Sequence, residues 1–205
     1  WACRIRGFCR GRYLPYNSMR MVIMGIDEVG RGPWAGPVVA AAVVLRDTIP
    51  GLKDSKTLTA RRRQELSDEI LRFSQVGVGW VTPEEIDQLG LTAAVGLAMR
   101  RAATQCGVQA DKTIIDGNYN FLPDMPQAET LIKADQTVPA VSAASIVAKV
   151  ARDSLMIKLG QQYPAYGFEK HVGYGTAQHA AALQQHGPIK GVHRFSFKPV
   201  YSSKS

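Results

Sequence analysis

The feature that most constrains this chain is a short apolar segment of β-forming residues that ends in an acidic residue and a loop. It occurs first at residues 22–27, where Glu28 and the turn Gly30-Arg31-Gly32 follow. It occurs again at residues 113–116 and a third time at residues 131–135. A carboxylate at the inner end of a buried strand needs a cation or hydrogen-bond donors to offset its desolvation. Because open α/β sheets place functional groups at the carboxyl ends of their strands, we expect these acids at one rim of a sheet.

Four carboxylates would meet at that rim: Asp27, Glu28, Asp116 and Asp135. Without histidine or cysteine beside them, they form a hard oxygen-donor set that suits Mg²⁺ or Mn²⁺. Two such ions about 3.5–4 Å apart activate a water and stabilise the leaving oxygen of a phosphoryl displacement. The pair Asp27 and Glu28 alone would also fit an ordinary turn whose aspartate binds backbone amides. Asp153 is a rival fourth ligand, although it falls within a predicted helix.

Further apolar patterns predict an α/β domain with a mixed sheet. The run Val38–Leu45 and the alternation of Val76, Val78 and Trp80 with glycines are typical of strands. Thr82 begins a capping box and marks the start of a helix. Short strands are expected at residues 112–116 and 130–133, and helices at residues 57–73, 92–106, 142–159, with Ser142 as the cap, and 176–186.

Length and composition exclude several classes of protein. With 205 residues, of which 45% are hydrophobic and 20% charged, the chain suits one compact domain and not a disordered protein. Its longest apolar run, Val38–Leu45, is far shorter than the ~18–20 residues that cross a membrane, so no membrane partner is expected. The net charge of +8 permits a nucleic-acid partner, but five of these charges lie in residues 1–20. We expect that leader to be a disordered or non-native extension, the alternative being a basic binding arm, and residues 21–205 to form the single domain.

The segment from Gly25 to Val43 resembles the opening signature of the ribonuclease HII family. Six further segments are similar to that family and occur in its order: residues 52–56, 115–117, 133–135, 143–153, 171–176 and 193–197. The resemblance covers about residues 22–200. It implies a ribonuclease H-like α/β fold, with a mixed five-stranded sheet flanked by helices and a small C-terminal helical lobe that begins near residue 160.

The resemblance implies an endoribonuclease that hydrolyses the RNA strand of RNA–DNA hybrids and cuts 5′ to single ribonucleotides embedded in duplex DNA. The products would carry 3′-hydroxyl and 5′-phosphate ends, and the cofactors would be two divalent cations, Mn²⁺ or Mg²⁺. The catalytic residues and metal ligands would be the same four acids, Asp27, Glu28, Asp116 and Asp135. The partners would be RNA–DNA hybrids and ribonucleotide-containing duplex DNA, and the protein would act as a cytoplasmic monomer.

The resemblance also assigns six residues to substrate binding: Gly30, Arg31, Gly32, Ser55, Lys56 and Tyr174. The Gly-Arg-Gly turn would read the ribose 2′-hydroxyl, because glycines let the backbone approach the minor groove. Tyr174 would stack on the ribonucleotide at a ribose–deoxyribose junction, although a tyrosine between two glycines also fits simple packing. Ser55 and Lys56 would contact backbone phosphates.

Two other kinds of protein are also compatible with these sequence features. A nucleotidyl transferase or resolvase would use similar acids, and a nucleic-acid-binding module without activity would share the fold. The Gly-Arg-Gly turn counts against the first, and the presence of all four acids counts against the second. Among the remaining polar residues, His171 and Arg194 are candidates for phosphate contacts, whereas His179 and His186 are expected at the surface of an Ala/Gln-rich helix.

Overall fold

The computed structural model describes residues 21–52, 55 and 57–202. The predictions made for residues 1–20 and for Lys56 lie outside these described residues. In chain order the elements are β1 (Ile23–Val29), β2 (Val38–Leu45), α1 (Ala60–Phe73), β3 (Ser74–Val81), α2 (Pro83–Leu89), α3 (Leu91–Cys106), β4 (Lys112–Asp116), β5 (Ala128–Leu131), α4 (Ala134–Thr137), α5 (Pro139–Gln162), the 3₁₀ helix η1 (Pro164–Tyr166), α6 (Phe168–His171), α7 (Ala177–His186) and α8 (Lys198–Ser202).

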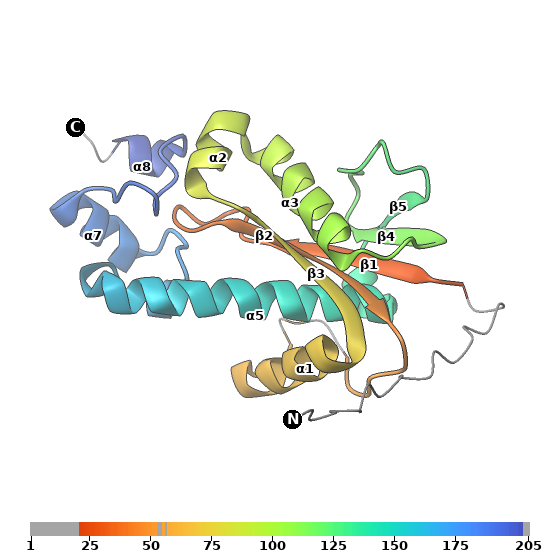
Figure 1. Cartoon of the computed structure of the whole chain (residues 1–205). Coiled ribbons are helices and arrows are strands. Elements are labelled where there is room, and N and C mark those ends of the chain that lie inside the picture. The colour runs from red at the N-terminus through yellow and green to blue at the C-terminus, as the bar shows by residue number, and fades with distance from the viewer. Residues whose placement is uncertain (1–20, 53–54, 56, 203–205) are drawn as a thin grey trace, which may run out of the picture.

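The strands form one mixed sheet of five in the order β3-β2-β1-β4-β5. The β1–β2 and β2–β3 pairs are antiparallel, whereas β1–β4 and β4–β5 are parallel. Helix α3 covers one face of the sheet, and the long helix α5, with α1 beyond it, covers the other (Figure 1). The predicted mixed five-stranded sheet is therefore confirmed.

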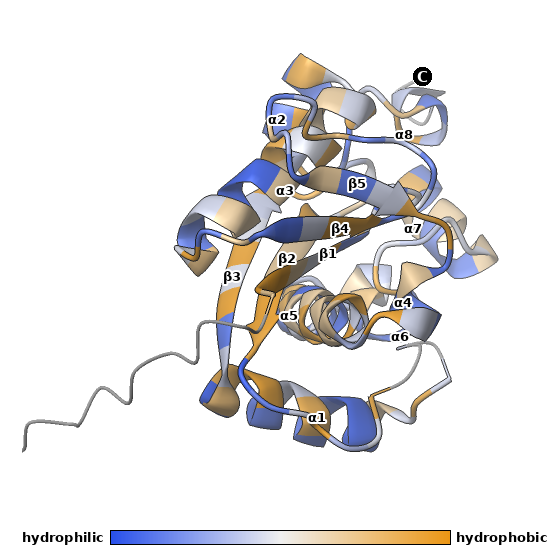
Figure 2. Cartoon of the chain, turned by 90° about the vertical axis from the view of Figure 1, so that its right-hand side faces the viewer, coloured by the Kyte–Doolittle hydropathy of each residue, from blue (hydrophilic) through white to orange (hydrophobic). Residues whose placement is uncertain are grey.

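Strand β2 reads as an uninterrupted apolar run because both of its faces are buried. Ala40 and Ala42 pack in the cluster that includes α3, whereas Ala41 and Val43 pack in the cluster that includes α1 and α5. A strand covered on both sides has no solvent-facing positions for polar residues. Figure 2 shows apolar residues along β2, and many hydrophilic residues on the outer helix α1.

Two glycines of β3 allow α3 to lie directly on the sheet. A side chain at Gly77 would overlap the backbone at Ala102 and Cys106, and one at Gly79 would overlap the carbonyl oxygen of Ala98. The alternation of this segment predicted the strand correctly. The face of β3 that carries the glycines is nevertheless buried under α3, and glycine at these positions lets the two backbones approach each other closely.

Three predicted boundaries are corrected by the structure. Strand β1 continues through the acidic pair to Val29, because these residues still pair with β2. Strand β5 ends at Leu131, and Asp135 lies in the first turn of α4 instead of at a strand end. Helix α5 begins at Pro139 after Val138, so Ser142 is not its cap, and its hydroxyl donates to the carbonyl of Asp135.

Among the described residues, no helix is both long and apolar enough to span a membrane.

The C-terminal part of the chain has a core that contains three buried histidines. His171, His179 and His193 are 8%, 0% and 0% exposed, so the prediction that His179 lies at the surface is wrong, as is the prediction that His171 faces phosphates. The rings of His171 and His179 stack at 4.7 Å. The Ala/Gln-rich pattern of α7 gave no sign of this core, because alanine is compatible with either environment.

The hydrogen bonds of these histidines define neutral rings. Ile189 N–H donates to His193 Nδ1 at 2.9 Å, so the proton of His193 is on Nε2, which donates to His179 Nε2 at 3.1 Å. His179 Nδ1 then donates to the carbonyl of Tyr174 at 3.0 Å. A second proton on either ring would place two donors against each other, so the network exists only in the neutral form.

The glycine face of β3 gives a first prediction. Gly79→Ala should lower the free energy of unfolding by roughly 2–3 kcal/mol, because α3 must move to make room for the methyl group. In urea unfolding at pH 7, the control Gly107→Ala should lose only about 1 kcal/mol, because this left-handed helix cap has space for a Cβ atom. Equal losses of unfolding free energy in Gly79→Ala and Gly107→Ala would show that the close approach of α3 to β3 is not the cause.

The histidine core gives a second prediction. Burial lowers the pKa of His193 to about 4, and nearby His179 acts in the same direction. Because the unfolded ring has a pKa near 6.5, the unfolded state binds more protons below that pH. The contribution of the His193 ring to the free energy of unfolding should be fully present above pH 6.5. It should decrease by up to about 3 kcal/mol as the pH drops towards 4.

The measurement is the free energy of unfolding of the wild type and His193→Gln between pH 7.5 and 4.5. The variant should have a shallower pH dependence in this window, whereas His186→Gln, at an exposed position, should match the wild type. A pH dependence unchanged in His193→Gln would contradict the assignment.

Candidate active site

The register of two parallel strands brings two of the predicted acids together. Ile26 pairs with Ile115, so Asp27 and Asp116 are the next residues along β1 and β4. Neighbouring strands lie about 4.8 Å apart. The two carboxylates interact, since the negative charge of Asp116 contributes to raising the pKa of Asp27.

Asp27 is a buried carboxyl group, with 8% of its surface exposed. Its Oδ1 accepts from the backbone N–H of Glu28 at 2.7 Å, and its side chain also bonds Ser145 of α5. Burial, followed by the charges of Glu28 and Asp116, raises the pKa of Asp27 to about 8. These two bonds only partly offset that effect, so the site favours an added positive charge.

The close contact of α5 with β1 explains why Ser145 reaches this strand. A side chain at Gly25, two residues before Asp27, would overlap the backbone of Ala140 and Val141. Gly25 and Asp27 lie on the same face of β1, because strand side chains alternate. Glycine at the first position thus lets α5 pack against the strand that carries the second.

Glu28 alternates to the other face of β1 and borders a cavity of about 350 Å³. Its Oε1 lies 3.3 Å from Nη1 of Arg31. Burial raises the pKa of Glu28, whereas the charge and hydrogen bond of Arg31 lower it. The cavity is lined by Glu28, Arg31, Thr92, Asp116, Gly117, Asn118, Tyr119 and Phe121. Two acids and one cation therefore face an open space large enough for part of a ligand.

Asp135 lies one residue after a direct contact of Asp116. The N–H of Ala134 donates to Asp116 Oδ1 at 2.8 Å, which holds α4 against the end of β4. Lys133, just before, has a left-handed backbone with φ 59°, which turns the chain from β5 into α4. Asp135 is 6% exposed, and its carbonyl accepts from Ser142. Its place depends on this turn and on α5, which strand periodicity could not predict.

The acids do not form a closed cage. Within the part of the chain that the structure describes, no three His, Cys, Asp or Glu side chains are grouped so as to hold a metal ion. Glu28 is turned towards Arg31, and Asp116 accepts a backbone N–H. Asp27, Glu28 and Asp116 nevertheless influence one another electrostatically, and that these three acids form one metal site with Asp135 stays a prediction.

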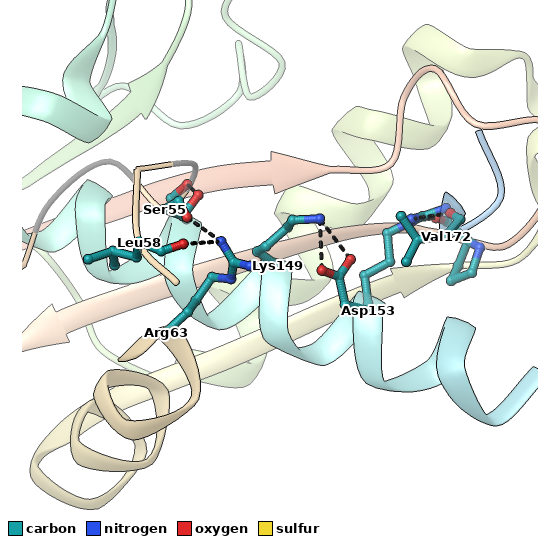
Figure 3. A network of polar contacts seen from close by, with 9 residues as sticks. Ser55, Leu58, Arg63, Lys149, Asp153 and Val172 are labelled. Atoms are coloured by element: carbon teal, nitrogen blue, oxygen red, sulfur yellow. Dashed lines mark hydrogen bonds and ion pairs between the residues drawn. The ribbon is translucent and has the colours of Figure 1, made fainter. Parts of the chain in front are cut away.

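Ser55 contacts the same part of α5 as Asp27. Its hydroxyl lies 2.9 Å from that of Ser145, and only 2% of the residue is exposed. Its carbonyl accepts from Arg63 of α1, as does that of Leu58 (Figure 3). In this arrangement Ser55 supports the surroundings of Asp27, and its contact with a phosphate stays a prediction.

Lys149 and Asp153, four residues apart on α5, form an ion pair. Lys149 Nζ lies 2.8 Å from Asp153 Oδ2, and Figure 3 shows the two side chains facing each other along the helix. Asp153 thus has a cation partner of its own on the same helix.

The Gly-Arg-Gly turn lies against Tyr174. Gly30 has φ 92°, a conformation that favours glycine, and a Cβ atom at Gly32 would stand 3.7 Å from the Tyr174 ring. Tyr174 itself is 44% exposed. The structure therefore brings together two segments separated by more than a hundred residues, and it leaves the tyrosine ring accessible beside the turn.

Two buried arginines near this turn were not recognised from the sequence as framework residues. Arg152 and Arg194 are both 0% exposed. Arg194 donates to the carbonyls of Gly30 and Arg31 at 2.6 and 3.0 Å, so the prediction that it faces phosphates is wrong. Arg152 occupies a buried position in the apolar pattern of α5. A charged residue at such a position is the sequence signal that could have indicated its framework role.

Comparisons with known proteins show the family of this chain. A family model described as Ribonuclease HII matches residues 24–200. The chain is 47% identical over 190 residues to a ribonuclease HII of Burkholderia mallei (strain SAVP1), covering 91% of this chain and 88% of that protein. It is 47% identical over 188 residues to a ribonuclease HII of Coxiella burnetii (strain Dugway 5J108-111), covering 90% and 92% respectively.

A solved structure has the same fold. The ribonuclease H2 from Pyrococcus horikoshii OT3 superimposes with a TM-score of 0.77 at 26% identity, covering 90% of this chain and 97% of that one. The family model spans β4, α5 and all but the first residue of β1. The chain belongs to the ribonuclease HII family and is a ribonuclease H, a hydrolase of the nuclease class.

Proposed function

We propose that this enzyme hydrolyses RNA paired to DNA and cuts 5′ to single ribonucleotides embedded in duplex DNA. The products would carry 3′-hydroxyl and 5′-phosphate ends. The observation that carries the proposal is the buried carboxyl of Asp27, which interacts with Glu28 and Asp116 at the end of two parallel strands. Family membership supports the substrate class, and the Gly-Arg-Gly turn beside Tyr174 supports selection of a ribose.

We further propose that Asp27, Glu28, Asp116 and Asp135 hold two divalent cations, Mg²⁺ or Mn²⁺. The donor set fits, because carboxylate oxygens are the ligands these hard ions prefer. The raised pKa values of Asp27 and Glu28 also fit, because burial first, and the negative charge of neighbouring acids second, disfavours their charged forms, and a bound cation would offset both effects. When bound, such ions would activate a water and stabilise the leaving oxygen.

The side chains themselves have separate tasks in this proposal. Ser145 and the N–H of Glu28 fix the carboxyl of Asp27 by hydrogen bonds, and the N–H of Ala134 fixes that of Asp116. Arg31 holds Glu28 at the cavity wall and offers a cation to the nucleic-acid backbone beside it.

The main chain of the turn would recognise the ribose. Glycines at positions 30 and 32 leave the peptide groups open to a 2′-hydroxyl, which is the group that distinguishes RNA from DNA. The accessible ring of Tyr174 would stack on the same nucleotide. Both contacts come from segments that touch each other, so one nucleotide could meet both.

The decisive experiment gives the protein a DNA duplex with one internal ribonucleotide, with and without Mg²⁺ or Mn²⁺. Metal-dependent cleavage 5′ to the ribonucleotide, with a 3′-hydroxyl and a 5′-phosphate, is the expected result. An all-DNA duplex of the same sequence is the control. Cleavage of that control would favour a resolvase-like enzyme, and binding without cleavage would favour an inactive module.

A third prediction concerns the central acid. Asp27→Asn should reduce the rate of cleavage by at least about 10³-fold, because it removes the charge shared by the acids at the strand ends. Its free energy of unfolding should stay equal or rise, since a buried carboxyl becomes a neutral amide. The rate is measured with saturating Mn²⁺ and the stability by urea unfolding.

The control for this prediction is Asp153→Asn, which removes a carboxylate paired with Lys149. It should retain cleavage within about threefold of the wild type, because this partly buried ion pair lies within α5 and not at the strand ends that carry Asp27 and Asp116. If Asp153→Asn lost as much activity as Asp27→Asn, the assignment of the acids would be wrong.

A fourth prediction concerns the tyrosine. Tyr174→Ala should lower kcat/KM on a duplex with one ribonucleotide by about tenfold or more, since base or sugar stacking on an aromatic ring is worth ~1–3 kcal/mol. Tyr174→Phe should stay within about threefold, because the ring remains. Cleavage of a long hybrid should change less than cleavage of the single-ribonucleotide duplex. A Tyr174→Ala enzyme with the wild-type ratio of the two rates would remove this role.

A further inference from the structure

Two loops meet beside the acids and carry the proposed ribose contacts. The turn loop, residues 30–37, contains Gly32, and the tyrosine loop, residues 171–175, contains Tyr174. The N–H of Trp34 donates to the carbonyl of Gly173 at 2.8 Å, and a side chain at Gly175 would overlap the Trp34 ring. The backbones of the loops are therefore in direct contact.

Arg152 of α5 binds both loops at once. Its Nε donates to the carbonyl of Pro37 at 3.0 Å and its Nη2 to that of Ala35 at 3.0 Å. Its Nη1 donates to the carbonyl of Val172 at 2.9 Å, on the tyrosine loop. All three guanidinium nitrogens are used on main-chain carbonyls, and the side chain is fully buried.

The residue that Arg152 binds on the tyrosine loop has an unusual backbone. Val172 has φ 43° and ψ 37°, in the left-handed region that β-branched residues rarely adopt. Such a conformation persists only where surrounding contacts hold it. Val172 lies two residues before Tyr174, so its backbone sets the direction in which that side chain leaves the loop.

Arg194 differs from Arg152 in the loops that it contacts. Its Nε, Nη1 and Nη2 donate to the carbonyls of Gly36, Arg31 and Gly30 at 2.9, 3.0 and 2.6 Å. All three acceptors belong to the turn loop. Arg194 thus fixes the shape of one loop, whereas Arg152 also connects that loop to the other.

We propose that Arg152 is a positioning residue that holds Tyr174 against the Gly-Arg-Gly turn and thereby sets the preference for a single ribonucleotide in DNA. This inference rests on the function proposed above. Arg152 touches neither substrate nor metal ligands in this assignment and acts through Val172 and Tyr174. A planar fork with donors in three directions is required, so lysine cannot replace it.

The test is a double-mutant cycle with Arg152→Lys and Tyr174→Ala, each assayed on the single-ribonucleotide duplex and on a long RNA–DNA hybrid. Arg152→Lys should lower the ratio of kcat/KM for the first substrate to that for the second by about tenfold. In the Tyr174→Ala background, the same substitution should change this ratio by less than about twofold, because the two residues act as a unit. Assays are run at a temperature at which each variant is folded by circular dichroism.

A further variant keeps the test valid if Arg152→Lys folds poorly. Glycine adopts the left-handed region without strain, so Val172→Gly added to Arg152→Lys should restore part of the ratio. Equal losses on both substrates, an effect of Arg152→Lys that persists unchanged without the tyrosine, or no restoration by Val172→Gly would overturn the inference. A wild-type protein that cuts neither duplex would instead refute the proposed function.

Discussion

The burial of Asp27 between β1 and α5 is the interaction on which the site depends. A carboxylate in this position is costly unless donors or cations surround it. The fold supplies Ser145 from the helix and a backbone N–H from Glu28, yet Glu28 and Asp116 add negative charge. Burial together with the two neighbouring acids disfavours the charged form of Asp27, and this is the physical basis of the cation site proposed above.

The surroundings of Tyr174 are fixed by a different principle. Arg152 and Arg194 donate to loop carbonyls, and His179 donates to the carbonyl of Tyr174 itself. Loop carbonyls cannot use a sheet ladder, and burial without donors would destabilise them. Side chains from α5, α7 and the C-terminal segment therefore replace a ladder, and the loops acquire defined shapes. A buried hydrogen-bond network of this kind favours a single arrangement over alternatives.

Much of the fold could be predicted from local patterns. The run Val38–Leu45 matches β2 residue for residue, and Thr82 caps α2 with the predicted reciprocal bonds to Glu85. Such features depend on near neighbours in sequence. The errors concern residues whose surroundings come from far along the chain, such as His179, buried against His193, and Asp135, placed by a left-handed turn at Lys133.

The sequence by itself determined the chemistry of the site: which acids exist, that they follow β-forming segments, and that hard oxygen donors outnumber other ligands. It also determined the family, through motifs in a fixed order. The tertiary structure decided which groups meet. The register of β1 with β4 puts Asp27 beside Asp116, and the approach of α5 at Gly25 supplies Ser145. Arg152 donates to a carbonyl of the turn loop, more than a hundred residues earlier in the chain, and to one of the tyrosine loop, about twenty residues later. Contacts over such separations depend on how helices pack on a sheet, and this packing is not encoded in the period of any one segment.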